Sequence, residues 1–325
     1  MNKSIFIKGI NYGWNSSRGD YISDLGIESM DKIVGTNCNW ISISFELIQD
    51  TFLSTNIYFD YQKSLTDSEI IFAIEHAHEL QLKVCLKPVV NPQDGVWRGF
   101  ISFSEAGDYW AKWFKSYTNA MIHYAEIAEK YHCEMFCIGC EMVRTQRREY
   151  EWCQYIKLLR NSYQGLLTYN ANHDAFKDIL WLDKIDIIGL SAYVEMQNCS
   201  NVDEMVHCWT GFKEEVKTLY KQFEKPIVFM EIGCINGTGC SVKPWQYELS
   251  QIVEYNENEQ ADYYEAAFRA MWNEEWFSGF FWWEWPIKLY KKNDVKKDIS
   301  YSPYLKKAER VLRKWYKNEG SRGYK

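Results

Sequence analysis

Short apolar runs and longer helix-patterned segments alternate along the chain. The apolar runs predict eight strands, at residues 5–14, 39–47, 83–90, 134–141, 166–171, 186–193, 227–233 and 279–285. The segments between them have apolar residues at helical spacing, as in 108–131. Alternation of this kind is typical of a parallel sheet covered by helices. The number of repeats favours a closed (β/α)8 TIM barrel over an open doubly wound sheet.

Local signals predict where two helices begin. Thr66 and Glu69 form a capping box ahead of an apolar stripe. Ser302 and Pro303 have the residue types of an N-cap and a first helical position. The helix predicted after them turns five residues inward: Leu305, Ala308, Val311, Leu312 and Trp315. Two long connections, 49–63 and 234–255, follow strands, and we expect both to shape a cleft at the catalytic face.

The chain is expected to form a single domain. Its 325 residues suit one eight-unit barrel, and no Pro/Gly/Ser-rich linker divides it. We therefore assign residues 1–317 to the barrel and 318–325 to a frayed C-terminal tail.

Charge and hydropathy narrow the choice of partners and location. With 44 acidic and 37 basic residues the net charge is −7, which argues against nucleic acid as a partner and suits a neutral substrate. No apolar stretch reaches the roughly 18 residues that span a membrane, and the N-terminal segment is too short and polar for a signal peptide. We expect a cytoplasmic protein, or a secreted one if a leader has been removed.

Metal and cofactor chemistry have little support in the sequence. Several of the ten cysteines lie inside apolar runs, where a reduced thiol behaves as a small hydrophobe. Cys137 and Cys140 have the spacing of a metal-binding pair, but residues three apart in a strand point to opposite faces. No zinc-binding histidine motif, nucleotide-binding loop or nucleophile elbow is present. No metal or cofactor is predicted.

Two glutamates carry the strongest functional signal. Glu141 and Glu231 each end a predicted strand, the place where a parallel barrel presents its catalytic residues. A pair of carboxylates is what cleavage of a glycosidic bond requires, with the two groups about 5 to 5.5 Å apart when configuration is retained. The alternative is that each glutamate pairs with a basic residue at the rim.

Aromatic residues support a carbohydrate ligand. They make up 17% of the chain and include 15 tryptophans, whose indoles can stack on the apolar face of a sugar ring. In the eighth strand, alternation places Trp283 and Trp285 on one face and Trp282 and Glu284 on the other. One face then supplies a platform for a sugar, unless the strand is simply a tryptophan-rich part of the core.

Further polar and aromatic residues follow other strands. Tyr193 either hydrogen-bonds Glu231, which would keep that carboxylate ionised, or is an ordinary rim tyrosine. Arg98 either binds sugar hydroxyls or a carboxylate, or braces its loop. Asn172 is a rim candidate whose other role would be in a turn. The remaining candidate substrate contacts are Trp14, Asn91, Trp97 and Asn236.

A set of motifs resembles glycoside hydrolase family 113, whose members are clan GH-A barrels acting on β-1,4-mannan and manno-oligosaccharides. The motifs are Lys-Pro with Trp-Arg-Gly, Gly-Cys-Glu141, Leu-Thr-Tyr with Asn172, Ile-Gly-Leu-Ser-Ala-Tyr193, Phe-Met-Glu231-Ile-Gly and Phe-Trp-Trp-Glu-Trp. They cover about residues 4 to 290. The resemblance implies that Glu141 is the acid/base and Glu231 the nucleophile. It also implies that Tyr193 lies beside the nucleophile, and that the sugar contacts include Asn91, Trp97, Arg98, Trp283 and Trp285.

Two positions depart from the pattern of that clan. Many members have Asn before the acid/base, where this chain has Cys140, so the usual contact to the sugar 2-hydroxyl is absent or comes from elsewhere. His173 follows Asn172, where an aromatic residue is expected. Both differences bear on the substrate rather than on the chemistry.

The leading hypothesis is a retaining hydrolase of β-1,4-linked mannosides, either manno-oligosaccharides or mannan, that works by double displacement without a metal or cofactor. Glu141 would need a raised pKa and Glu231 an ionised state. One alternative keeps the fold and mechanism but changes the sugar to a β-glucoside, a β-xyloside or a mannose-containing surface glycan. Another is a carbohydrate-binding barrel without activity. The sequence does not determine the oligomeric state.

Overall fold

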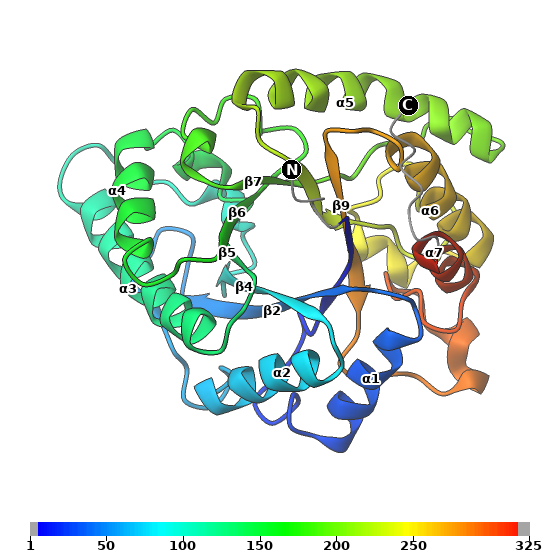
Figure 1. The fold of residues 1–325 in the computed structure, drawn as a ribbon, viewed down its shortest axis with the longest axis horizontal. Coiled ribbons are helices and arrows are strands. Elements are labelled where there is room, and N and C mark those ends of the chain that lie inside the picture. Colours follow the sequence, from blue (N-terminus) through cyan, green and yellow to red (C-terminus); the bar gives the residue numbers. More distant parts are fainter. Residues whose placement is uncertain (1–5, 318–325) are drawn as a thin grey trace.

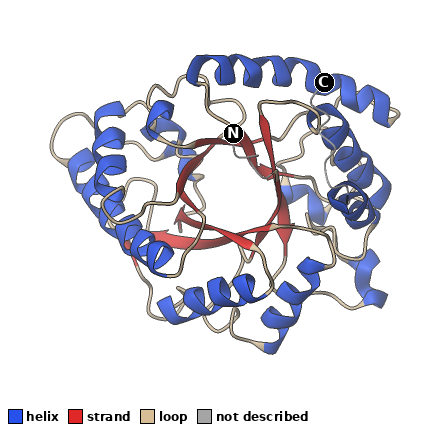
Figure 2. Cartoon of the chain, in the orientation of Figure 1, coloured by secondary structure: helices blue, strands red, loops and turns tan. Residues whose placement is uncertain are grey.

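Eight parallel strands close into a barrel. The computed structural model describes residues 6–317. Around the barrel the strand order is β1, β9, β8, β7, β6, β5, β4, β2, and β2 pairs with β1 to close the ring (Figures 1 and 2). The strands are β1 (Ile7–Tyr12), β2 (Trp40–Gln49), β4 (Lys83–Pro92), β5 (Met135–Cys140), β6 (Leu166–Ala171), β7 (Ile187–Ser191), β8 (Ile227–Ile232) and β9 (Phe277–Trp285). The predicted (β/α)8 barrel is confirmed.

The helices form a ring outside the barrel (Figure 2). They are α1 (Asp24–Val34), α2 (Asp67–Glu79), α3 (Tyr109–Lys130), α4 (Glu149–Leu159), α5 (Val202–Phe223), α6 (Glu257–Met271) and α7 (Lys307–Lys317). The unit between β6 and β7 departs from the repeat, because a short 3-10 helix (Leu182–Lys184) replaces the α-helix there. No helix within residues 6–317 is long and apolar enough to cross a membrane.

Helix starts followed the local signals in one case and not in the other. The capping box of α2 is present, with Thr66 Oγ1 accepting from the amide of Glu69 at 3.3 Å. The predicted start at Ser302 and Pro303 was wrong, because α7 begins at Lys307. Leu305 has a φ of 58° in the left-handed region, which interrupts the helix, and its side chain is exposed rather than inward.

Two hydrophobic layers support the barrel. The larger lies between the strands and the helices, and it includes the indole of Trp282 stacked on Tyr264. The smaller fills the barrel interior and consists of Ile7, Trp40, Cys85, Met135, Cys137, Ile187, Val228, Met230 and Phe281. Parallel barrels bury both faces of each strand, which is why the strands read as continuous apolar runs.

The two long connections differ in role. The first contains the short strand β3 (Ile57–Tyr58), which pairs antiparallel with β2 and packs against α3. The second contains a 3-10 helix (Tyr247–Gln251) and a bridge between Gly237 and Tyr255. Residue 5 of the first predicted strand and the predicted tail 318–325 lie outside the described residues.

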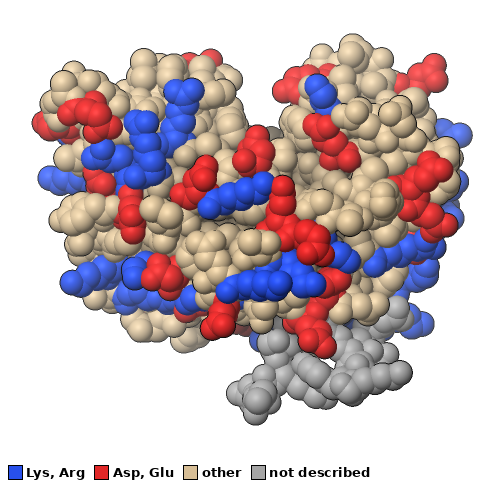
Figure 3. Space-filling view, turned by 90° about the horizontal axis from the view of Figure 1, so that it is seen from above, with Lys and Arg blue, Asp and Glu red and all other residues tan. Residues whose placement is uncertain are grey.

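The surface carries both signs of charge. On the face drawn in Figure 3, acidic and basic side chains are interspersed, and the outline is hollowed between two raised parts. This face has no extended basic patch that would suit a polyanion.

Candidate active site

Glu141 and Glu231 lie at the carboxyl ends of strands. Glu141 directly follows β5, and Glu231 lies near the end of β8. Both are largely buried, with 7% and 6% of their surface exposed. The backbone of Glu141 is in the left-handed region, with φ 52°, and its amide donates to the carbonyl of Asn170 at 2.8 Å. This bond to β6 fixes the turn from which the Glu141 side chain enters the site.

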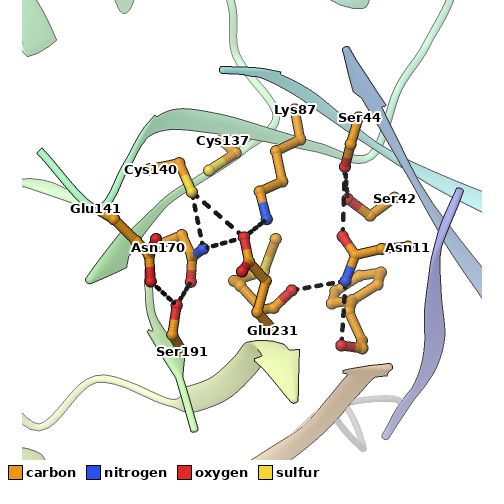
Figure 4. Close-up of polar contacts among 12 residues, drawn as sticks. Asn11, Ser42, Ser44, Lys87, Cys137, Cys140, Glu141, Asn170, Ser191 and Glu231 are labelled. Carbon is orange, nitrogen blue, oxygen red and sulfur yellow. Dashed lines mark hydrogen bonds and ion pairs between the residues drawn. The ribbon is translucent and has the colours of Figure 1, made fainter. Parts of the chain in front are cut away.

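Four groups hold the carboxylate of Glu231. Its Oε1 accepts from Lys87 Nζ at 2.5 Å, Asn170 Nδ2 at 2.8 Å and Cys140 Sγ at 3.3 Å (Figure 4). Its Oε2 accepts from the hydroxyl of Tyr193 at 3.3 Å. Burial alone would raise the pKa of Glu231, but the charge and hydrogen bond of Lys87, helped by the Arg98 charge and the Cys140 thiol, hold that pKa below its ordinary value.

Glu141 has the opposite environment. Its Oε1 accepts from Ser191 Oγ at 2.7 Å and from Asn172 Nδ2 at 3.0 Å. Burial and the negative charge of Glu231 raise the pKa of Glu141, outweighing the contrary effects of Arg98, Ser191 and Lys87. The two carboxyl groups are therefore prepared for different protonation states.

A chain of hydrogen bonds links the two acids. Ser191 donates to Glu141, and its hydroxyl also lies 3.5 Å from Asn170 Oδ1, while the amide of Asn170 donates to Glu231 (Figure 4). Since Asn170 and Ser191 lie on β6 and β7, between the strands of the two glutamates, barrel closure itself sets their relative position.

A cavity of about 790 Å³ opens over the two glutamates. Trp14 and Trp283 lie on it with ring centroids 5.8 Å apart, and the Arg98 guanidinium lies 5.4 Å from the Trp14 ring. Arg98 Nε is buried without a hydrogen-bond partner among the described residues. The other lining residues are Asn15, Trp97, Asn172, His173, Asp174, Tyr193, Trp245, Gln246, Tyr247, Glu248, Glu284 and Tyr301. The volume and the aromatic walls suit an oligosaccharide.

Three predicted contacts lie elsewhere. Trp285 is fully buried and donates its Nε1 proton to the carbonyl of Ser29, so its prediction as a sugar contact was wrong. Asn236 was also wrong, because it is fully buried and bonds the backbone of Asp298 and Ser300. Asn91 does not line the cavity and donates to Glu46 at 2.7 Å.

Strict alternation fails at the end of β9. The peptide bond between Trp283 and Glu284 is cis, and both residues line the cavity. The predicted pairing of Trp283 with Trp285 on one face was therefore wrong.

Sequence reasoning missed several residues of the site. Lys87, Asn170 and Ser191 are polar residues inside otherwise apolar strands, and that was the available signal, since a fully buried polar side chain needs a partner. Glu284, Trp245 and Tyr301 were not selected either. The connection 234–255 supplies Trp245 to Glu248 to the cavity wall, whereas 49–63 supplies no lining residue, contrary to our expectation for it.

The two departures from the clan pattern fit into the site. Cys140 accepts from Asn170 Nδ2 at 3.1 Å and donates to Glu231, so it is part of the nucleophile's support. His173 packs on Trp245 with centroids 5.0 Å apart, as an aromatic ring would.

The argument that Cys137 and Cys140 point to opposite faces was wrong. The register shifts between them, and both side chains face the barrel interior (Figure 4). Both thiols are free, and no group of three or more potential metal ligands occurs within residues 6–317.

Paired carboxylates with opposed pKa shifts, under an aromatic-lined cavity at the carboxyl end of a (β/α)8 barrel, define the class as a glycoside hydrolase. The chain belongs to glycoside hydrolase family 113, whose family model matches residues 10–306.

Solved structures of the same family are similar over almost the whole chain. One family 113 β-1,4-mannanase is 34% identical with a TM-score of 0.90, covering 97% of this chain and 99% of its own. The family 113 β-mannanase of Alicyclobacillus acidocaldarius, solved in complex with ManMIm, is 36% identical with a TM-score of 0.90, covering 97% and 98%. A Ruminococcus gnavus β-glucuronidase, 15% identical with a TM-score of 0.64 over 96% of this chain and 50% of its own, shares the fold alone. A search of curated proteins finds no match.

Proposed function

We propose that this protein is a retaining hydrolase of β-1,4-linked mannosides, with Glu231 as nucleophile and Glu141 as acid/base. The opposed environments of the two carboxyl groups carry the proposal, because one is held ionised by Lys87 and the other is driven toward its protonated form. The sugar is inferred from family 113 relatives that are described as β-1,4-mannanases.

In the first step Glu231 attacks the anomeric carbon and the bond to the leaving oxygen breaks. Oε1 of Glu231 already accepts three hydrogen bonds, whereas Oε2 accepts one, from Tyr193 at 3.3 Å. We therefore assign the attack to Oε2. Glu141 gives its proton to the leaving oxygen, which departs as a hydroxyl group.

In the second step water releases the sugar from Glu231. Once the ester has formed, Glu231 no longer carries the negative charge that raised the pKa of Glu141. That pKa falls, and Glu141 becomes able to accept a proton from the attacking water. Water adds to the anomeric carbon, the ester bond breaks, and both glutamates return to their starting states with the configuration retained.

The connection after β8 is expected to help hold the substrate. Its residues Trp245 to Glu248 line the cavity and combine polar and aromatic side chains, whereas Trp14 and Trp283 contribute indoles.

We also propose the cytoplasm as the location, because six of the ten cysteines are buried and all are free, which suits a reducing compartment. Fractionation of cells that express the protein tests the location.

The direct test incubates wild type, Glu141→Gln and Glu231→Gln with mannotriose through mannohexaose. We expect wild type to cleave them and both substitutions to abolish cleavage, while NMR of the first product shows the β-anomer. The pattern of first products distinguishes internal from terminal cutting. If wild type leaves every manno-oligosaccharide intact, the mannoside assignment fails, and a panel of aryl β-glucosides and β-xylosides then identifies another sugar or an inactive binding protein.

A further inference from the structure

A third carboxyl group lies on the cavity and has no part in the mechanism above. Glu284 is near the end of β9, beside Trp283, and is half-buried. It lines the same cavity as Glu141 and Glu231. Glu284 and Glu231 come from the neighbouring strands β9 and β8, and the charge of Glu231 acts on Glu284, so the two carboxyl groups lie near each other on this cavity.

The side chain of Glu284 differs from the two catalytic carboxyls in its contacts. Glu141 has two side-chain donors and Glu231 has four. Within residues 6–317 the carboxyl of Glu284 takes part in no hydrogen bond or ion pair. A carboxyl group that borders a cavity and has no protein partner is available to a ligand.

We propose that Glu284 is a substrate-binding and specificity-determining residue, which hydrogen-bonds ring hydroxyl groups of the sugar whose anomeric carbon Glu231 attacks. The inference rests on the proposed function for the identity of that sugar. It does not depend on whether the sugar is mannose, because every hexopyranoside presents hydroxyl groups at its ring positions.

The groups around Glu284 favour its neutral form. The charges of Glu231, on β8, and of Asp298, in the segment that follows β9, act on Glu284. Besides burial, Glu284 in turn raises the pKa of two phenols, that of Tyr301 in the same segment as Asp298 and that of Tyr21 ahead of α1. Asp298 is itself paired with Lys306 at 2.6 Å. Burial first, and then the charges of Glu231 and Asp298, raise the pKa of Glu284 to about 8.

A neutral carboxyl suits the recognition of sugar hydroxyls. Its O–H group donates one hydrogen bond and its carbonyl oxygen accepts another, so it can engage one hydroxyl in both senses or two neighbouring hydroxyls together. It also adds no negative charge beside Glu231 at neutral pH. Ionisation above pH 8 would remove the donor and place a second anion near the nucleophile.

The test crosses variants of Glu284 with substrates that lack single hydroxyl groups. Wild type, Glu284→Ala and Glu284→Gln are assayed on an aryl β-mannoside and on its 2-, 3-, 4- and 6-deoxy analogues. We expect Glu284→Ala to lower kcat/KM about 10- to 100-fold on the parent sugar, mainly through KM, because a hydrogen-bonded hydroxyl loses its partner. On the analogue that lacks the contacted hydroxyl, the same substitution should change kcat/KM less than about threefold.

Glu284→Gln keeps a donor and an acceptor in the same shape but does not titrate. We expect its KM to stay near the wild-type value at pH 6.5 and to remain flat where wild-type KM rises above about pH 8. Glu275→Gln, an exposed change in the turn that precedes β9, is the control for loss of one negative charge. Thermal unfolding of each variant checks that it is folded.

Two results would overturn the proposal. One is an equal loss on all five substrates for folded Glu284→Ala, or no loss on any. The other is a rise of KM above pH 8 in Glu284→Gln that matches wild type. Failure of the mannoside assignment looks different, because wild type itself would then be inactive on the aryl β-mannoside. The same comparison of variants and deoxy analogues is then made with the aryl β-glycoside that wild type does cleave.

Discussion

The ion pair between Lys87 and Glu231 offers a sharp test of how the nucleophile is kept ionised. Lys87 is fully buried in β4, and its Nζ lies 2.5 Å from Glu231 Oε1. Lys87→Met keeps an unbranched side chain of similar length and removes the charge. The remaining donors to the carboxylate are neutral, and Arg98 is left as the cation that lowers its pKa.

The expected size of the effect follows from the lost interaction. A hydrogen bond to a charged group contributes about 1.5 to 3 kcal/mol. One pKa unit corresponds to about 1.36 kcal/mol, so the pKa of Glu231 should rise by about 1 to 2 units. Activity requires the ionised form, and therefore the acidic limb of the profile of kcat/KM against pH should move upward by the same amount.

The stability of the variant should depend on pH in a direction set by the same shift. In wild type the folded pKa of Glu231 is below the ordinary value of 4.5, so the ionised pair stabilises the fold above that pH, and the contribution is lost as pH falls through the folded pKa. Without Lys87, burial raises the folded pKa, and the carboxylate destabilises the fold above pH 4.5. The deficit, up to about 3 to 5 kcal/mol, should therefore be largest near neutral pH and should shrink in acid.

Kinetics from pH 3.5 to 8 and thermal unfolding over the same range would measure both effects. Lys306→Met is the matched control, since Lys306 is also fully buried and paired, with Asp298, but neither residue lines the cavity. It should lower Tm without moving the acidic limb. An acidic limb that stays in place in a folded Lys87→Met variant would refute the claim that Lys87 controls the ionisation of Glu231.

Three further predictions concern the rest of the site. Ser191→Ala removes a hydrogen bond that lowers the pKa of Glu141, so the basic limb of the pH profile should move upward, as pH-rate measurements would show. Glu141→Gln should slow cleavage of oligosaccharides about 10²- to 10⁴-fold more than that of aryl glycosides with acidic leaving groups, which need no proton, and an equal loss on both would contradict its role. Trp283→Ala should raise KM with a small change in Tm, whereas Trp285→Ala should cost about 3 to 5 kcal/mol of stability. Kinetics and denaturant unfolding of the two tryptophan variants would measure both effects. A large loss of stability in Trp283→Ala, or a raised KM without loss of stability in Trp285→Ala, would contradict these roles.

The positions of the strands could be predicted because buried parallel strands have a simple sequence pattern. Each is apolar on both faces, so each appears as a short continuous run between helical stripes. All eight runs correspond to strands of the barrel. Helix boundaries are harder to predict from sequence. The start of α7, for example, depends on the left-handed backbone of Leu305 rather than on the Ser302-Pro303 signal.

The candidate site could be predicted only as far as it depends on strand ends. Residues at the carboxyl ends of parallel strands share one face of a barrel, and that rule was enough to find Glu141, Glu231, Asn172 and Tyr193. It also selected Asn236, which follows a strand but turns into the structure to bond backbone atoms. Position along a strand says where a residue lies, and not which neighbours its side chain meets.

The sequence by itself thus determined the barrel, its catalytic face and the two acids that stand on it, because these depend on local periodicity and on the order of strands. Only the tertiary structure decided how the acids differ. Lys87 comes from β4, Asn170 from β6 and Ser191 from β7, and they act on the glutamates because closure of the barrel turns them toward a shared interior. The register shift that turns Cys140 inward and the path of β9 that brings Glu284 to the cavity are likewise set by contacts between strands, which no single segment of the chain encodes.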